Sequence, residues 1–276
     1  MTAIQVGSCN FHYSRAGEGA PTLLFVHGGF CDRSDWVHQV ENLQDEFTVV
    51  AYDQRCHGVS EAPYDTCSVE QFAVDVHDLI DTLELGPTIV IGHSLGARVT
   101  IQAAADRPDH LLGIVLVDGS RLTKGNSVDQ VASVEAARFG ENPADYLDYR
   151  FRAMFFENAD PAVRDRIILK AVTTPREAIK AIAGGTGRWD ALGLETALRR
   201  IPTNLPALAI QSTYHDEKTE RYPLQPGTTT TPWLDLLRSH MPQLKVKITP
   251  MCGHFNMLEA AGDVNDAIRG FARSLR

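Results

Sequence analysis

Residues 90–99, VIGHSLGARV, decide the fold of this chain. They join an apolar, β-branched run to a segment with the composition of a helix, and Gly92 and Gly96 flank Ser94 at a spacing of two. Glycine suits neither a strand nor a helix, so the pattern Gly-x-Ser-x-Gly predicts a tight turn in which the two backbones approach closely. Such a turn holds the hydroxyl of Ser94 clear of the sheet, beside a helix N-terminus, as in a nucleophile elbow.

Short apolar runs recur along the chain, and turn-forming residues follow each of them. The runs occupy residues 23–26, 47–52, 88–91, 113–117, 207–210 and 244–248. Continuous runs of this kind are typical of strands that are covered on both faces. Helix-like segments lie between them, at residues 34–43, 69–83, 95–106 and 261–275. The alternation predicts an α/β fold with a mostly parallel, twisted β-sheet flanked by helices, preceded by an antiparallel hairpin in residues 3–17.

Residues 122–205 break this alternation, because they contain no clear strand. Helix-like segments fill the interval, at residues 127–139, 142–156, 160–172 and 174–185. Asp160 and Thr174 each precede a proline, and a capping residue before proline is a typical helix start. We therefore predict a helical cap at 122–205, inserted between two strands of a core domain that consists of residues 1–121 and 206–276.

The composition is that of a soluble globular protein. The chain has 276 residues, of which 43% are hydrophobic and 22% charged, enough for one large domain with a sizeable core. A net charge of −9 argues against nucleic acid or an anionic membrane as the main partner. No apolar run is long enough to cross a membrane. We expect a small-molecule partner, and the sequence indicates no particular oligomeric state.

The cysteines and the first residues bear on location. The five cysteines are Cys9, Cys31, Cys56, Cys67 and Cys252, and no Cys-x-x-Cys pair occurs. An odd number without such pairs indicates reduced thiols rather than a disulfide framework or a structural zinc site. The first residues have neither the basic start nor the apolar stretch of a signal peptide. These features predict a cytoplasmic protein.

A serine nucleophile needs a base, and His254 is the candidate. It follows the last predicted strand and precedes the last predicted helix, so it lies at the same edge of the sheet as Ser94. Two carboxylates could orient the imidazole and stabilise its protonated form. Asp118 ends the run 113–117, and Asp216 follows the run 207–210.

The chain resembles the α/β-hydrolase superfamily over nearly its whole length. The motifs that carry the resemblance are FVHGGF at 25–30, AYDQRCHGVS at 51–60, GHSLG at 92–96 and CGHFNMLE at 252–259. In many relatives the acid follows the second-last strand in a pattern like G-x-x-D, but here Ser212 replaces the glycine and Asp216 falls one residue late. A minority of capped esterases use the aspartate that ends the earlier strand. The resemblance therefore favours Asp118 over Asp216 as the third member of a catalytic triad.

Two backbone N–H groups are expected to form the oxyanion hole. One is that of Leu95, the residue after the nucleophile. Similarity to the superfamily's H-G-x signature implies Gly29 N–H as the second, with Phe30 N–H as the alternative. The segment AYDQRCHGVS is similar to the family's D-x-R-G-H-G-x-S, with Cys56 in place of the usual glycine. We expect its other polar side chains to pin the loop.

Serine at the elbow predicts an acyl-enzyme rather than the alkyl-enzyme that aspartate would form there. The sequence thus favours a hydrolase of small or medium carboxylic esters, lactones or thioesters. Its alternatives are carbon–carbon bond hydrolysis, perhydrolysis, cofactor-free oxygenation, or ligand binding without catalysis on the same scaffold. We expect the substrate pocket to include Phe30, His93, Phe155 and Phe255.

No cofactor is predicted. The chain has neither a dinucleotide fingerprint nor a phosphate-binding loop. His27, His57 and His93 could lie near one another, but two of them belong to turn motifs and no carboxylate is spaced as a ligand. We therefore predict no metal site.

Overall fold

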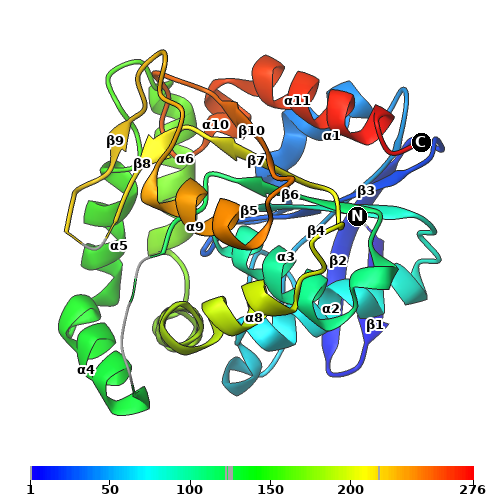
Figure 1. The fold of residues 1–276 in the computed structure, drawn as a ribbon. Coiled ribbons are helices and arrows are strands. Elements are labelled where there is room, and N and C mark those ends of the chain that lie inside the picture. Colours follow the sequence, from blue (N-terminus) through cyan, green and yellow to red (C-terminus); the bar gives the residue numbers. More distant parts are fainter. Residues whose placement is uncertain (1, 122, 124–126, 217) are drawn as a thin grey trace.

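The computed structural model describes residues 2–121, 123, 127–216 and 218–276 (Figure 1). Its centre is an eight-stranded sheet in the order β1-β2-β4-β3-β5-β6-β7-β10. The strands of this sheet are β1 Thr2–Val6, β2 Cys9–Ala16, β3 Thr22–Val26, β4 Thr48–Tyr52, β5 Thr88–His93, β6 Gly113–Val117, β7 Ala207–Gln211 and β10 Lys245–Ile248. All neighbours from β4 to β10 pair in parallel, and β1 and β2 form the antiparallel hairpin at one edge. The α/β prediction is therefore confirmed.

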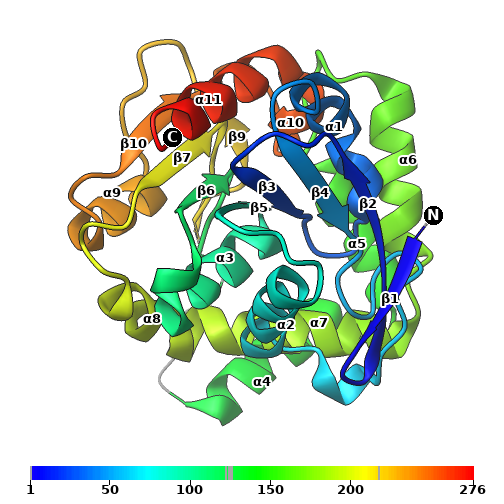
Figure 2. The same ribbon diagram turned by 90° about the vertical axis from the view of Figure 1, so that its right-hand side faces the viewer.

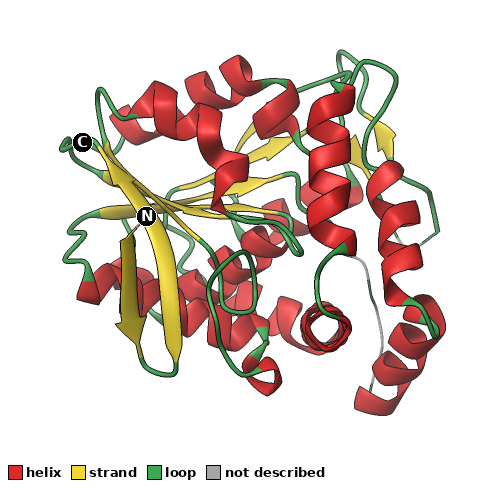
Figure 3. Cartoon of the chain, turned by 180° about the vertical axis from the view of Figure 1, so that it is seen from behind, coloured by secondary structure: helices red, strands yellow, loops and turns green. Residues whose placement is uncertain are grey.

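The apolar runs became strands because both faces of the sheet are covered. Every residue of β3, β4, β5, β6 and β7 is buried. On one face lie α1 Val37–Leu43 and α11 Ala261–Arg273, and on the other lie α2 Val69–Thr82 and α3 Leu95–Asp106 (Figures 2 and 3). The strands alternate their side chains between these two apolar layers, which form the core.

Several shorter elements departed from the sequence prediction. The segment that we expected to be one helix from residue 34 begins as a 3₁₀ turn, Arg33–Trp36, before α1. Helix α9, Pro232–His240, and the two-stranded pair of β8 Thr213–Tyr214 with β9 Tyr222–Pro223 were not predicted. Another short helix, α10 Asn256–Glu259, precedes α11.

Among the residues that the structure describes between β6 and β7, there are five helices and a π-helical turn. They are α4 Val128–Phe139, α5 Pro143–Arg152, α6 Pro161–Val172, α7 Arg176–Arg188, the turn Trp189–Gly193 and α8 Leu194–Arg200. Asp160 caps α6 as predicted, since its side chain accepts a hydrogen bond from Ala162 N. Thr174 does not cap α7, because Pro175 holds the capping position in an extended conformation and α7 begins one residue later.

The predicted division into core and cap remains a proposal. Met1 and Leu122, the first residues of its two parts, lie outside the described residues. Figure 1 shows α4, α5 and α7 beyond the carboxyl ends of the strands, where a cap would lie. Among the described helices, none combines the length and the apolar character that a membrane crossing requires.

The turn at Ser94 is the tightest feature of the sheet edge. Ser94 adopts φ 55° and ψ −107°, a backbone conformation that residues other than glycine rarely take. A methyl group on Gly92 would collide with the backbone carbonyl of Gly96, and one on Gly96 would collide with the carbonyl of Val26. The two glycines therefore permit the close approach of strand and helix that the sequence predicted.

We expect Gly92→Ala to lower the free energy of unfolding by about 3 kcal/mol, near the upper end of what overpacking costs. The added methyl group has no free space, because the backbone of Gly96 and the hydroxyl of Thr100 occupy it. Gly184→Ala in α7 is the matched control, since nothing lies within 4 Å of its added methyl group. Urea denaturation of both variants measures the difference, and equal stabilities would contradict the close-approach explanation.

Candidate active site

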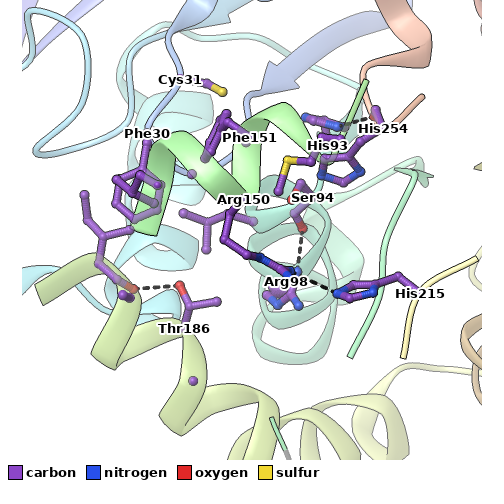
Figure 4. A pocket seen from close by; sticks show the side chains of 18 of the residues that line it. Phe30, Cys31, His93, Ser94, Arg98, Arg150, Phe151, Thr186, His215 and His254 are labelled. Atoms are coloured by element: carbon purple, nitrogen blue, oxygen red, sulfur yellow. Dashed lines mark hydrogen bonds between the residues drawn. The ribbon is translucent and has the colours of Figure 1, made fainter. Parts of the chain in front are cut away.

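A pocket opens at the carboxyl ends of the strands, where the loops after β3, β5 and β10 meet α5 and α7 (Figure 4). Ser94 and His254 both belong to its lining. Much of the lining is apolar, and we call this part of it the apolar wall: Phe30, Phe139, Leu147, Phe151, Ile182 and Phe255. Its polar lining includes two guanidinium groups, those of Arg98 and Arg150. The pocket can therefore hold an apolar group and an anionic or polar group at once.

Asp118 is the carboxylate that contacts His254. The loop after β6 carries it, and its Oδ2 lies 2.6 Å from His254 Nδ1, with both side chains buried. A carboxylate accepts hydrogen bonds, so Nδ1 carries the proton and Nε2 is left with its lone pair. This pairing gives the imidazole the tautomer that a general base needs.

Four further donors hold the Asp118 carboxylate in place. Its Oδ1 accepts from the backbone N–H groups of Ser212 and Thr213, each at 2.8 Å. Its Oδ2 accepts from the Thr213 hydroxyl at 2.6 Å and lies 3.1 Å from Arg221 Nη1. Asp118 itself adopts φ 40°, and such backbone strain is typical of functional sites.

Asp216 does not contact His254 in the structure. It lines the pocket, but its carboxylate accepts from Tyr214 Oη at 2.9 Å and from the backbone N–H groups of Lys218 and Thr219. These bonds, led by that of Lys218, lower the pKa of Asp216 to about 2. The side chain closes its own turn as an anion.

Burial keeps both neighbouring imidazoles neutral. Burial first, and then the charge of Arg221, lowers the pKa of His254 well below its ordinary value. Burial and the proximity of His254 do the same for His93. His93 Nε2 lies 2.9 Å from the backbone oxygen of His254 and donates to it, which helps to fix the loop that carries His254.

The expected oxyanion-hole residues Leu95, Gly29 and Phe30 all line the pocket. Leu95 is the first residue of α3, and the first four N–H groups of a helix have no acceptor within it. The positive end of the helix dipole lies at the same point. Gly29 and Phe30 lie in the loop after β3, and Phe30 has φ 62°.

Three of the four residues that we expected in the substrate pocket belong to its lining: Phe30, His93 and Phe255. Phe155 does not. Its ring stacks on that of Phe255, with centroids 5.0 Å apart and planes 4° from parallel, so it supports the pocket from behind. Aromatic residues between β6 and β7 serve both for packing and for lining, and the sequence does not separate the two roles.

Sequence reasoning missed the arginines around the pocket. Arg98 lies one helical turn after Ser94 and donates to the Ser94 backbone oxygen at 3.1 Å. It also forms a buried, two-pronged ion pair with Asp190 in the π-helical turn, at 2.6 and 2.8 Å. A charged residue in the otherwise uncharged stretch LGARVTIQAAA was the available signal. Arg221 and Arg150 carried no such signal, because both lie in polar segments.

The loop that resembles D-x-R-G-H-G-x-S makes contacts within itself and with neighbouring helices. Asp53 accepts from the backbone of Arg33 and Val59, and Arg55 pairs with Asp75 through two bonds of 2.5 and 2.6 Å. Cys56, where glycine is usual, has φ 62°.

The three histidines that could have lain together, His27, His57 and His93, do not form one cluster. The ring centroids of His27 and His57 are 5.1 Å apart, whereas His93 packs on His254. Within the part of the chain that the structure describes, no group of three or more metal-ligating side chains is arranged to hold an ion.

A model of the alpha/beta hydrolase family matches residues 23–267. Among curated proteins, the chain is similar to 2-(acetamidomethylene)succinate hydrolase of Mesorhizobium japonicum, with 32% identity over 164 residues that cover 53% of this chain and 59% of that protein. It is also similar to (E)-2-((N-methylformamido)methylene)succinate hydrolase of Acinetobacter baylyi, with 32% identity over 108 residues, or 39% of this chain and 41% of that protein. The chain therefore spans about half the length of these relatives.

Solved structures resemble the whole chain. An esterase from Thermogutta terrifontis superimposes with a TM-score of 0.81 at 22% identity, covering 100% of this chain and 99% of that one. The enol-lactonase from Burkholderia xenovorans LB400 superimposes with a TM-score of 0.79 at 23% identity, covering 98% and 99%. At these identities the likeness concerns the fold.

Proposed function

Because the chain belongs to the alpha/beta hydrolase family, we propose that it is a serine hydrolase that forms an acyl-enzyme on Ser94. Its substrate is a small or medium carboxylic ester, lactone or thioester. The observation that carries this proposal is the 2.6 Å contact between His254 Nδ1 and Asp118 Oδ2 beside a pocket lined by Ser94 and His254.

In the first half of the reaction, His254 Nε2 removes the proton of the Ser94 hydroxyl as its oxygen attacks the carbonyl carbon of the substrate. The carbonyl oxygen becomes an oxyanion, to which the backbone N–H groups of Leu95 and Gly29 donate. Asp118 stabilises the imidazolium that has formed. His254 then passes the proton to the leaving oxygen or sulfur as the bond to it breaks.

In the second half, a water molecule attacks the acyl carbon and gives a proton to His254 Nε2. The second oxyanion collapses, the bond between the acyl group and Ser94 breaks, and the serine oxygen recovers the proton. A neutral His254 is required at the start of both halves. Burial, by lowering its pKa, supplies that state at pH 7.

The cap proposed at 122–205 acts as the lid of the pocket. Helices α5 and α7 contribute Phe151, Ile182 and other lining residues, which makes the entrance apolar. The names of the similar proteins, a lactonase and two hydrolases of substituted methylenesuccinates, support hydrolysis of a small carbonyl compound.

A serine-directed fluorophosphonate tests the proposal. We expect it to label the native protein at Ser94, as the serine oxygen bonds to phosphorus and fluoride leaves. Intact-mass measurement and peptide mapping check both the adduct and its position, and Ser94→Ala serves as the unlabelled control. A native protein that neither reacts nor turns over any ester would favour the ligand-binding alternative.

A further inference from the structure

Arg98 and Arg150 line the pocket, and a third arginine, Arg221, lies beside it against Asp118; two of the three have carboxylate partners. Arg98 pairs with buried Asp190, and Arg221, whose side chain is 4% exposed, pairs with Asp118. Arg150 is different. It lies near the end of α5, is half-buried and lines the pocket, yet no carboxylate among the described residues forms an ion pair with it. Its charge is therefore available to a ligand.

The partner that Arg150 does have orients it without neutralising it. Arg150 Nη2 lies 3.1 Å from His215 Nε2, a contact that Figure 4 marks with a dashed line. The other ring nitrogen of His215 lies 3.0 Å from the backbone oxygen of Thr219 and donates to it, which leaves Nε2 as the acceptor. Burial first, and then the charge of Arg221, lowers the pKa of His215 to about 4. The imidazole is thus neutral at pH 7.

Asp216, the neighbour of His215, does not neutralise the charge of Arg150. It lines the same pocket, but the three donors of its own turn occupy its oxygens. The guanidinium of Arg150 thus shares the pocket with Ser94 and His254, and no carboxylate of the described residues occupies its N–H groups. A planar guanidinium binds a carboxylate through two parallel hydrogen bonds, and such pairs are among the strongest polar contacts in proteins.

We propose that Arg150 binds a carboxylate group of the substrate, so that the pocket selects esters or lactones that carry a second, ionised carboxyl group. This inference rests on the proposed ester hydrolysis at Ser94. The reacting carbonyl lies at Ser94, the carboxylate at Arg150, and the intervening carbon chain against the apolar wall formed by residues such as Phe151 and Ile182.

Pairs of esters that differ only in charge test the proposal. Monoethyl succinate, glutarate and adipate are compared with the ethyl esters in which a primary amide replaces the free carboxylate. The two members of a pair have nearly the same shape, so the ratio of their kcat/KM values, measured by pH-stat, reports the charge alone. For the best chain length we expect a ratio of about 10 or more in the wild-type protein. A ratio of 1 or below at every length would overturn the proposal.

Arg150→Gln is expected to bring this ratio close to 1, since glutamine donates hydrogen bonds without charge. Arg152→Gln is the matched control. Arg152 belongs to the same helix, is 56% exposed, pairs with Asp148 and is absent from the pocket lining, so its loss leaves the ratio as in the wild-type protein. A high ratio that survives Arg150→Gln would also overturn the proposal.

Failure of the proposed function is recognised separately. If no ester of either kind is turned over, the proposed ester hydrolysis at Ser94 is refuted. A binding measurement then tests whether Arg150 binds a carboxylate. Isothermal titration with succinate, glutarate and adipate then gives binding that Arg150→Gln abolishes and Arg152→Gln retains. The absence of binding to the wild-type protein, or binding that Arg150→Gln leaves intact, would refute the carboxylate site itself.

Discussion

Replacing Ser94 with alanine is expected to lower kcat for ester hydrolysis by about 10⁵-fold, which leaves only the residual acceleration that the oxyanion hole and substrate binding provide. Alanine removes the only atom that forms the acyl-enzyme, and His254 then has no nucleophile to deprotonate. The backbone conformation at this position, φ 55°, is strained for serine and alanine alike, so we expect the fold to persist. Hydrolysis of p-nitrophenyl acetate measures the loss, followed either by absorbance at about 400 nm or by pH-stat titration of the released acid.

Ser239→Ala provides the comparison for this experiment. Ser239 is an exposed residue of α9 whose hydroxyl donates to the Leu236 backbone oxygen, and it is absent from the pocket lining. Its variant retains full activity. Turnover that survived Ser94→Ala at the wild-type rate would contradict the acyl-enzyme and favour chemistry that depends on His254 and Asp118 alone, such as cofactor-free oxygenation.

Asp118→Asn carries the second large effect, a loss in kcat of about 10³- to 10⁴-fold. An asparagine can present its NH₂ group to His254 Nδ1, which favours the tautomer with the proton on Nε2 and so removes the base. It also leaves the imidazolium without a counter-charge and Arg221 without its carboxylate partner. We expect Asp216→Asn to cost far less, because Asp216 closes its own turn and does not contact His254.

The comparison of these two variants needs a measure of folding. Near-ultraviolet circular dichroism and thermal melts separate a loss of catalysis from a loss of structure, since Asp118 also binds the backbone of Ser212 and Thr213. The opposite ranking, with Asp216→Asn the more damaging variant, would refute the role we propose for Asp118.

Much of the fold was predictable because its signals are local. Strands such as β6, Gly113–Val117, are buried on both faces, and a continuous apolar run in the sequence predicts such burial. Helix α9 was missed for the opposite reason. Its residues Trp233, Leu234 and Leu237 are buried among mostly polar neighbours, and the segment follows a run of threonines that reads as a loop.

The candidate site was predictable only in part, because its partners meet through the fold. Ser94 lies in a motif with its own turn chemistry, and His254 has a fixed place after the last strand. The choice between Asp118 and Asp216 depended on whether the carboxylate after β6 or the one after β7 reaches the imidazole, and the arrangement of the strands in space decides this. Arg150 and His215 are 65 residues apart in the sequence, and no pattern in the residues around either of them predicts their contact.

The ion pair between Arg98 and Asp190 has a consequence for the design of chimaeras. One partner belongs to the helix that begins at the elbow, the other to the segment between β6 and β7, and both are buried. Grafting that whole segment from a homologue would leave the buried guanidinium of Arg98 unpaired, unless the homologous segment places an acidic residue at the same position. A buried charge that has lost its partner costs on the order of 3–5 kcal/mol. Swaps of the segment between β6 and β7 must therefore transfer both residues as a unit, or replace both with apolar ones.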